Sequence, residues 1–376
     1  MIMKPTNPFI TTGYAGPDYF CDRKEETARL YRELTNGNNI VLLAHRRMGK
    51  TGLVEHCVAT NNMKKDFNVF VVDIFSAKNQ KDFTLMLANA MVDNLKSFDR
   101  RSLDLFLSVV TSLQGVLSGE TPGGPTLKVQ YAGRPKPDCT LEQLFDFVRR
   151  AKKPSLLAID EFQQVAKFPE KNTEALLRTY IQKVPDSRFV FAGSERRVMG
   201  RMFTEANSPF YQSATPMHLA PINPAAYADF IEDKFEGAGK AIDREIIQEV
   251  YDKFDGITWY VQKLMNAMFS LTRKGERCSN ETYSNALDEI LRSYDYIYEE
   301  TLFNMPEKQK ELLIALAREG ATKELQSDEF CSRYGMSASS VQSARNGLLK
   351  KECITEDLGN YHLYDKFLEI WIKTKY

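Results

Sequence analysis

Short apolar runs alternate with longer helical patterns through the first 220 residues of the chain. The apolar runs have the length of strands: NIVLLA (39–44), NVFVVDIF (68–75), SLLAID (155–160), RFVFAGS (188–194) and MHLA (217–220). Several are apolar almost throughout, which is typical of strands covered on both faces. Helical stretches such as DFTLMLANAMVDNLKSF (82–98) and LEQLFDFVRRA (141–151) separate them. The alternation predicts a doubly wound α/β domain with a parallel sheet.

One segment breaks this rhythm. Residues 115–138 are rich in glycine and proline and contain one short alternating run, TLKVQYA (126–132). This pattern predicts a loop or small hairpin inserted before the third strand.

After Pro221 the strand pattern stops, and residues 224–295 predict several helices. Farther on, two short helices joined by a glycine-containing turn precede an apparent hairpin, CITEDLGNYHLY (353–364). That order is typical of a winged helix-turn-helix. The predicted organisation is listed in chain order: an N-terminal extension (1–19), the α/β domain (20–220), a helical domain (221–300) and a winged-helix domain (301–376).

Composition narrows the class of protein. Of 376 residues, 43% are hydrophobic and 27% charged, which are globular values, and 50 basic residues balance 50 acidic ones. No net field therefore draws the whole molecule to nucleic acid. The six cysteines show no CxxC spacing, which favours buried thiols in a reducing compartment. With no apolar run of membrane-span length and no signal-peptide core at the start, we expect a cytoplasmic protein without a membrane partner.

The first chemical motif is Gly49-Lys50-Thr51, between a buried strand and a helix expected to begin near Gly52. A helix N-terminus carries unsatisfied N–H groups and a partial positive charge, so it can hold a phosphate. In this context Lys50 would reach the β- and γ-phosphates of a nucleotide, and the Thr51 hydroxyl would coordinate Mg²⁺. A Gly-Lys-Thr turn without any ligand is the alternative.

The glycine that normally begins this motif is replaced by Ala44. Glycine is indispensable only where φ is positive or where a Cβ would strike the phosphate. We therefore expect Ala44 to have a negative φ at the end of the strand, and Gly49 to be the glycine that the loop requires.

The second motif is Asp160-Glu161, which ends a buried strand. Two adjacent carboxylates are costly at such a place without a task. In a Walker B arrangement Asp160 holds Mg²⁺ and Glu161 acts as general base toward the attacking water. The alternative is that Asp160 only caps the following helix. Because both motifs follow apolar strands in the expected order, together they predict a nucleoside triphosphate site.

Polar residues at the end of the next strand add to this prediction. Ser194 ends the run RFVFAGS and would lie beside the γ-phosphate, or would simply end a strand. Arg196 and Arg197 follow at once, and one of them could reach the γ-phosphate, whereas a solvated helix start is the commoner reason for such a pair. Arg46 and Arg47 would add positive charge inside the loop or face water.

These segments together resemble the archaeal-type ATPase family, within the STAND group of AAA-related P-loop NTPases, over nearly the full length. The similar segments are FCDRKEE (20–26), HRRMGKTGL (45–53), LLAIDEFQ (156–163), FVFAGSERRVM (189–199), FDGITWYVQKL (254–264) and HLYDKFLEIWI (362–372). The resemblance implies a P-loop sheet in 5-1-4-3-2 order, a helical lid, a C-terminal winged helix, and ATP as the nucleotide. It also implies that Gly256 to Trp259 face the nucleotide, although GITW lacks the proline that relatives often carry.

The site residues that follow from the motifs and the resemblance fall into three groups. The resemblance places Phe20 to Arg23 near the adenine and ribose. Those expected to bind nucleotide are Phe20, Arg23, His45, Arg46, Arg47, Met48, Gly49, Lys50, Thr51 and Gly52. Those expected to act in catalysis are Lys50, Glu161 and Ser194, and those expected to hold Mg²⁺ are Thr51 and Asp160.

Two functions fit these features. The first is an ATP-binding, Mg²⁺-dependent ATPase that hydrolyses slowly and acts as a nucleotide-controlled switch on an unknown protein partner. The second is a DNA-binding regulator or loader whose nucleotide site is mainly structural. Within 330–351 the basic residues Arg333, Arg345, Lys350 and Lys351 occur without an acidic residue, which would suit duplex DNA.

Overall fold

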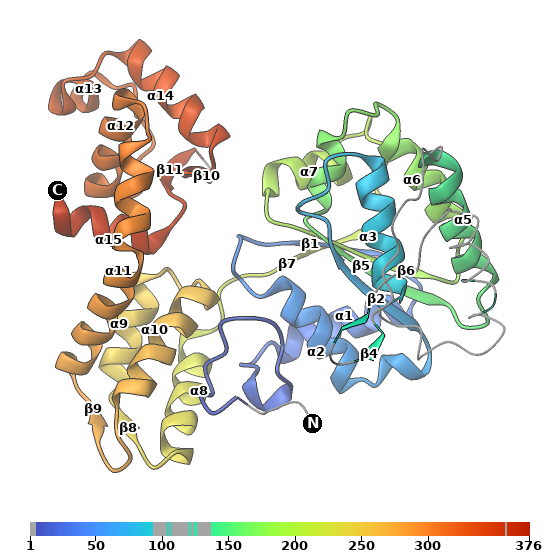
Figure 1. Cartoon of the computed structure of the whole chain (residues 1–376), viewed down its shortest axis with the longest axis horizontal. Coiled ribbons are helices and arrows are strands. Elements are labelled where there is room, and N and C mark those ends of the chain that lie inside the picture. Colours follow the sequence, from blue (N-terminus) through green and yellow to red (C-terminus); the bar gives the residue numbers. More distant parts are fainter. Residues whose placement is uncertain are drawn as a thin grey trace. The chain divides into compact units, whose positions relative to one another are not determined.

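The computed structural model (Figure 1) describes residues 5–92, 104, 106, 120–121, 124–125, 137–357 and 359–376. The chain forms two compact units. The first comprises Met1–Phe230 with Ile257–Trp259, and the second comprises Ile231–Gly256 with Tyr260–Tyr376. The predicted limits of the α/β, helical and winged-helix domains stay a prediction.

The first unit is built on a parallel five-stranded sheet in the order β2-β5-β6-β1-β7. The strands are β1 (Ile40–Leu43), β2 (Asn68–Asp73), β5 (Ser155–Asp160), β6 (Arg188–Gly193) and β7 (Thr215–His218). Numbered by their succession in the chain, these five strands lie in the order 2-3-4-1-5. The predicted parallel sheet and its 5-1-4-3-2 order are confirmed. The register pairs Asp73 with Asp160, so both lie at the carboxyl edge.

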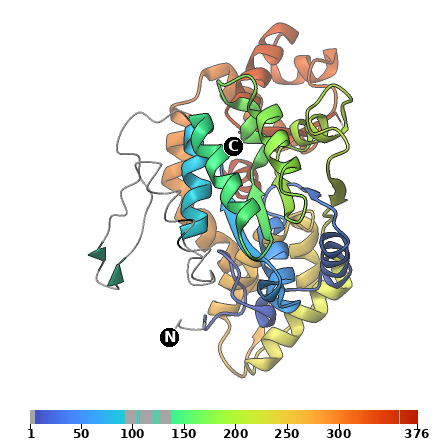
Figure 2. The same cartoon turned by 90° about the vertical axis from the view of Figure 1, so that its right-hand side faces the viewer.

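Helices cover the sheet on both faces because successive strand side chains point to opposite sides. Val41 and Leu43 pack in one core with α3, α5, α6 and α7, whereas Ile40 and Leu42 pack in the other core with α1 and α2 (Figure 1). The helices are α1 (Lys24–Thr35), α2 (Lys50–Thr60), α3 (Gln80–Val92), α5 (Pro137–Arg150), α6 (Thr173–Gln182) and α7 (Arg196–Thr204). Figure 2 shows α3 and α5 side by side on their face of the sheet.

The small hairpin expected before the third strand is present where the structure describes it. Strands β3 (Glu120–Thr121) and β4 (Gly124–Pro125) pair antiparallel. The alternating run 126–132 and the end of the helix predicted over 82–98 lie outside the described residues.

Helices dominate the next part of the chain: α8 (Pro224–Gly237), α9 (Arg244–Lys253), α10 (Thr258–Leu271) and α11 (Asn280–Phe303). The expectation that strands stop after Pro221 is wrong in one detail. Two two-residue strands, β8 (Ala241–Ile242) and β9 (Arg277–Cys278), pair in parallel. Strands this short carry no alternating pattern from which to predict them.

The end of the chain has the predicted winged-helix pattern. Helices α12 (Glu307–Glu319), α13 (Asp328–Tyr334) and α14 (Ala338–Lys350) precede the antiparallel wing β10 (Ile354–Asp357) and β11 (Asn360–Leu363), and α15 (Lys366–Lys375) follows. The turn between α13 and α14 depends on two residues. Gly335 ends α13 at a positive φ of 62°, and the Ser337 hydroxyl accepts the Ser340 N–H to cap α14.

None of the described helices combines the length and the apolar character that a membrane crossing requires.

Candidate functional site

The loop from Ala44 to Gly49 connects β1 to α2 at the carboxyl edge of the sheet. Arg47 and Gly49 have positive φ values of 68° and 84°, whereas Ala44 is not among the described residues with positive φ. A Cβ at Gly49 would meet nothing within 4 Å, so backbone conformation and not crowding requires glycine there. The assignment of Gly49, and not position 44, as the glycine that this loop needs is therefore confirmed.

Helix α2 begins at Lys50, two residues before the predicted start near Gly52, with Gly49 as its N-cap. Lys50 and Thr51 thus lie in the first turn, where helix N–H groups have no partner within the helix. The Met48 side chain is 2% exposed and packs in the core between α2 and the sheet. This burial anchors the loop, so that only the backbone of Met48 could contact a bound anion.

Lys50 is 6% exposed. Burial lowers the pKa of its ammonium group, the carboxylates of Asp160 and Glu161 act in the opposite direction, and the Arg46 charge lowers it further. A desolvated cation among the N–H groups of a helix start gains strongly from an anionic phosphate, because a buried charge needs a partner.

The two motifs meet in a direct contact. The Thr51 hydroxyl donates a short hydrogen bond to Oδ2 of Asp160, 109 residues away in the chain. Oδ1 of Asp160 accepts the backbone N–H of Glu161 at 2.9 Å. A hydroxyl and a carboxylate are hard oxygen ligands, as Mg²⁺ prefers. Among the described residues no group of three or more His, Cys, Asp and Glu side chains gathers as a metal centre.

Glu161 lies just beyond β5 in a left-handed conformation, with φ 56° and ψ 38°. Its side chain is buried, and its Oε2 accepts the hydroxyl of Ser194 at 2.7 Å and the side-chain amide of Gln163. The two predicted catalytic residues at the ends of β5 and β6 are thus in contact. The Gln163 contact was not predicted from the sequence.

Arg196 lies beside the phosphate loop. Its Nη1 is 3.0 Å from Nε2 of His45, so the start of α7 meets the loop at a predicted nucleotide-binding residue. Arg197 is exposed. Of the two arginines left open by the sequence, Arg196 is the one beside the loop.

A third carboxylate, Asp73, lies at the carboxyl edge of the sheet and was not predicted from the sequence. Asp73 ends β2, in register with Asp160. Burial raises the pKa of Asp73, and so do Asp160 and Glu161; the Phe75 N–H and the charge of Arg46 lower it. Arg46 lies with its guanidinium 5.0 Å from the centre of the Phe75 ring. The signal was available in the sequence, because the run NVFVVD ends in an aspartate as SLLAID does.

Phe20 packs beside the start of α2. Its ring stacks on His56 with centroids 4.1 Å apart, and a Cβ at Gly52 would lie 3.4 Å from Cε2 of Phe20. The Tyr14 hydroxyl is 3.0 Å from Nδ1 of His56 and completes the cluster. The position of Phe20 near the adenine, which the resemblance implied, stays a prediction.

Arg23 is 3% exposed and has a positive φ of 61°. Its Nη1 donates to the Ala220 carbonyl at 2.6 Å and to Glu26 at 2.8 Å. These contacts tie the start of α1 to the chain after β7. A role of Arg23 toward the ribose stays a prediction.

Trp259 contacts the phosphate loop although the GITW segment lacks the proline that the resemblance led us to expect. Its backbone N–H donates to the Arg47 carbonyl at 3.0 Å, and the Arg47 guanidinium lies 4.1 Å from the centre of its ring. Its indole N–H donates to the Thr11 carbonyl at 3.0 Å. Arg47 has positive φ without being glycine, which is uncommon. The contacts of Trp259 hold that conformation in place.

His56 predicts a pH dependence of stability. Burial lowers its pKa below the usual 6.5, so the unfolded chain binds more protons just below that pH and stability falls on acidification. We expect His56→Phe, which keeps an aromatic ring against Phe20, to lose less unfolding free energy than wild type between about pH 7 and about pH 5. Urea unfolding at each pH measures this.

The same measurement on His218→Phe controls for the loss of a histidine, since His218 is exposed. Parallel curves for wild type and His56→Phe would contradict the prediction.

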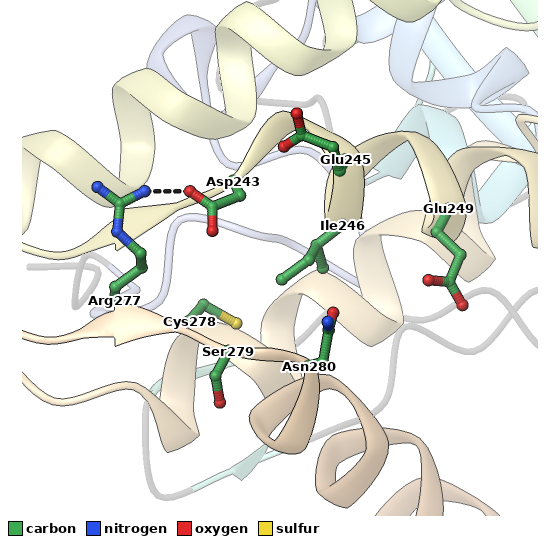
Figure 3. A pocket seen from close by; sticks show the side chains of 8 residues that line it. All are labelled: Asp243, Glu245, Ile246, Glu249, Arg277, Cys278, Ser279 and Asn280. Carbon is green, nitrogen blue, oxygen red and sulfur yellow. Dashed lines mark hydrogen bonds and ion pairs between the residues drawn. The ribbon is translucent and has the colours of Figure 1, made fainter.

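A cavity of about 430 Å³ lies in the second unit between α9 and the start of α11 (Figure 3). Its lining residues are Asp243, Glu245, Ile246, Glu249, Arg277, Cys278, Ser279 and Asn280. Arg277 is paired with Asp243, so the remaining charge is acidic. No residue of the predicted nucleotide site lines it, and acidic walls repel phosphate.

Two family models match the sequence. The one described as "ATPase domain predominantly from Archaea" matches residues 20–264, and the one described as "Probable winged helix domain" matches residues 296–374. No curated protein matches.

Solved structures share the fold. The Walker-type ATPase PABY2304 of Pyrococcus abyssi is 16% identical with a TM-score of 0.64, covering 97% of this chain and 99% of that one. The ORC2 protein of Aeropyrum pernix, solved with ADPNP and ADP, is 14% identical with a TM-score of 0.56 and 98% of each chain covered. The Cdc6p protein of Pyrobaculum aerophilum is 14% identical with a TM-score of 0.50, covering 98% of this chain and 96% of that one.

Proposed function

The chain belongs to the family of ATPase domains found predominantly in Archaea. We therefore propose that it binds Mg²⁺ and ATP at residues 45–52 and slowly hydrolyses ATP at the γ-phosphate. The observation that carries this proposal is the contact between Thr51 and Asp160. It joins the phosphate loop to the acidic strand end, and it lies beside a buried lysine and a buried glutamate.

Each polar group of the site then has a task. Lys50 binds the β- and γ-phosphate oxygens, and Thr51 and Asp160 hold Mg²⁺, which neutralises charge on those oxygens when bound. Glu161 accepts a proton from the attacking water as general base. The Ser194 hydroxyl, which donates to Glu161 in this structure, is placed at the end of the neighbouring strand to donate to the γ-phosphate instead.

We further propose that the protein is a nucleotide-controlled switch of the STAND type. Support comes from Ile257–Trp259, which belong to the first unit while Gly256 and Tyr260 on either side belong to the second. Trp259 is hydrogen-bonded to Arg47 in the phosphate loop, and its ring contacts the Arg47 guanidinium. A nucleotide that shifts the loop would therefore move Trp259, which is covalently joined to the second unit through Tyr260. The buried thiols of Cys21, Cys57 and Cys278 suit the reducing environment of the cytoplasm.

Thr51→Val tests the Mg²⁺ site, because valine keeps the size of threonine and removes the hydroxyl. We expect phosphate release to fall about 10-fold or more, as lost metal positioning weakens charge neutralisation in the transition state. Thr51→Val should bind ATP with Mg²⁺ no more tightly than ATP in EDTA. Thr51→Ser should keep both the parental rate of phosphate release and the tighter binding with Mg²⁺. Titration calorimetry and a phosphate-release assay measure these effects. A Thr51→Val protein that hydrolyses ATP at the parental rate would refute the proposed site.

The winged helix adds no second function to this proposal. In the 330–351 segment that suggested duplex DNA, Arg333 is paired with Glu319 and Glu329. Arg345 lies against Tyr361 of the wing. The binding partner of the winged helix stays a prediction. Measuring its binding to duplex DNA across a salt series would distinguish a DNA partner from a protein partner.

A further inference from the structure

Gln163 places its side chain inside the catalytic cluster. It is two residues beyond Glu161 on the short helix η4 (Phe162–Lys167) and is 1% exposed. Its Nε2 donates to Oε2 of Glu161 and lies 3.5 Å from the Ser194 hydroxyl. Oε2 of Glu161 therefore receives two donors, one from its own segment and one from the end of β6.

The orientation of this amide follows from chemistry. Turned the other way, Gln163 would place its carbonyl oxygen against a carboxylate oxygen, which repels it. In the present orientation Oε1 of Gln163 is buried and has no hydrogen-bond partner. A buried amide with one unsatisfied atom is unfavourable for folding, so stability alone does not account for glutamine at this position.

Gly193 provides the room for that unpaired oxygen. A Cβ at Gly193 would overlap Oε1 of Gln163 and would lie 2.6 Å from Cγ of Met199. Gly193 is not among the described glycines with positive φ, so space and not backbone conformation requires glycine here. The last residue of β6 thus shapes the position of an amide that holds Glu161.

We propose that Gln163 is a positioning residue for Glu161, an inference that rests on the proposed ATPase function. Its amide holds Oε2 of the carboxylate, so that Oε1, which receives neither donor, is presented for the proton of the attacking water. When the Ser194 hydroxyl turns to a γ-phosphate, the Gln163 amide is the donor that stays on Glu161. The residue acts through Glu161 and does not touch the nucleotide.

Gln163→Met tests this, since methionine has similar length and no hydrogen-bond donor. We expect kcat to fall about 10- to 100-fold, the cost of a misplaced reacting group, while KM and ATP affinity stay at the parental values. Gln164→Met is the matched control: Gln164 is the next residue on the same helix and is 9% exposed, and its backbone N–H, which the substitution keeps, donates to the Glu161 carbonyl at 3.0 Å. It should turn over as the parent does.

A double-mutant cycle separates positioning from general damage. In the Glu161→Gln background, Gln163→Met should cause no further loss in single-turnover rate, because its effect is exerted through the carboxylate. Gly193→Ala should reproduce the kcat loss of Gln163→Met. The double variant with both changes should lose no more kcat than either single variant. Thermal unfolding confirms that each variant is folded.

The possible results separate the positioning role of Gln163 from the proposed ATPase activity. No ATP hydrolysis by the parent protein would overturn both. Hydrolysis that Glu161→Gln abolishes but Gln163→Met leaves at the Gln164→Met level would overturn the positioning role alone. An equal loss in both backgrounds of the cycle would also overturn it.

Discussion

Lys50→Ala is expected to abolish nucleotide binding. Lys50 is buried at the first turn of α2, where its ammonium group would face the phosphates. Truncating one partner of a buried charge pair costs about 3 kcal/mol, equivalent to about 100-fold in Kd. Calorimetry at ATP concentrations about ten times the parental Kd should therefore find almost no heat of binding for Lys50→Ala.

A second measurement makes this result independent of calorimetry. Ligand that binds only the folded state raises the Tm, so ATP should raise the Tm of the parent and not that of Lys50→Ala. Lys65→Ala, which removes an exposed lysine from η2 (Met63–Lys65), should keep the parental shift. An ATP-dependent Tm shift in Lys50→Ala equal to that of the parent would remove the phosphate site from this loop.

Glu161→Gln is expected to separate binding from turnover. Glutamine has the size of glutamate and can still accept the Ser194 hydroxyl, so the fold and the ATP affinity should be preserved. It cannot take a proton from water, and general base catalysis contributes about 100-fold or more. Phosphate release should fall by at least that factor, while the Tm shift caused by ATP stays.

The same assay identifies a wrong base. If Glu161→Gln hydrolysed ATP at the parental rate, Asp73 would be the first alternative, because it is a further carboxylate at this edge of the sheet and Asp160 is assigned to Mg²⁺. Glu205→Gln, a change of the same kind at an exposed residue at the end of α7, controls for the loss of one negative charge.

The sequence predicted the site where its residues follow a buried strand. Asp160 and Ser194 stand at the ends of apolar runs, Lys50 follows another such run after the loop 44–49, and the carboxyl ends of parallel strands meet at one edge. That geometry brings residues more than one hundred positions apart into contact, as for Thr51 and Asp160. The order of the strands came from the family resemblance, since apolar runs do not specify their neighbours.

What the sequence did not predict depends on packing between distant segments. The bond of Gln163 to Glu161 needs the missing side chain at Gly193, and neither residue stands out in a single sequence. The contacts of Trp259 with Arg47 and Thr11 join three segments across more than two hundred residues. The left-handed conformation of Arg47 was unexpected because arginine has no preference for it.

The position of Trp259 also gives the protein a built-in optical probe. The chain has two tryptophans, and the other, Trp371, lies in the second unit with its ring against Tyr298. In a Trp371→Phe protein, the indole stacked on Arg47 would be the only tryptophan emitter. Its fluorescence would then report on the phosphate loop in real time, without a label and without a modified nucleotide.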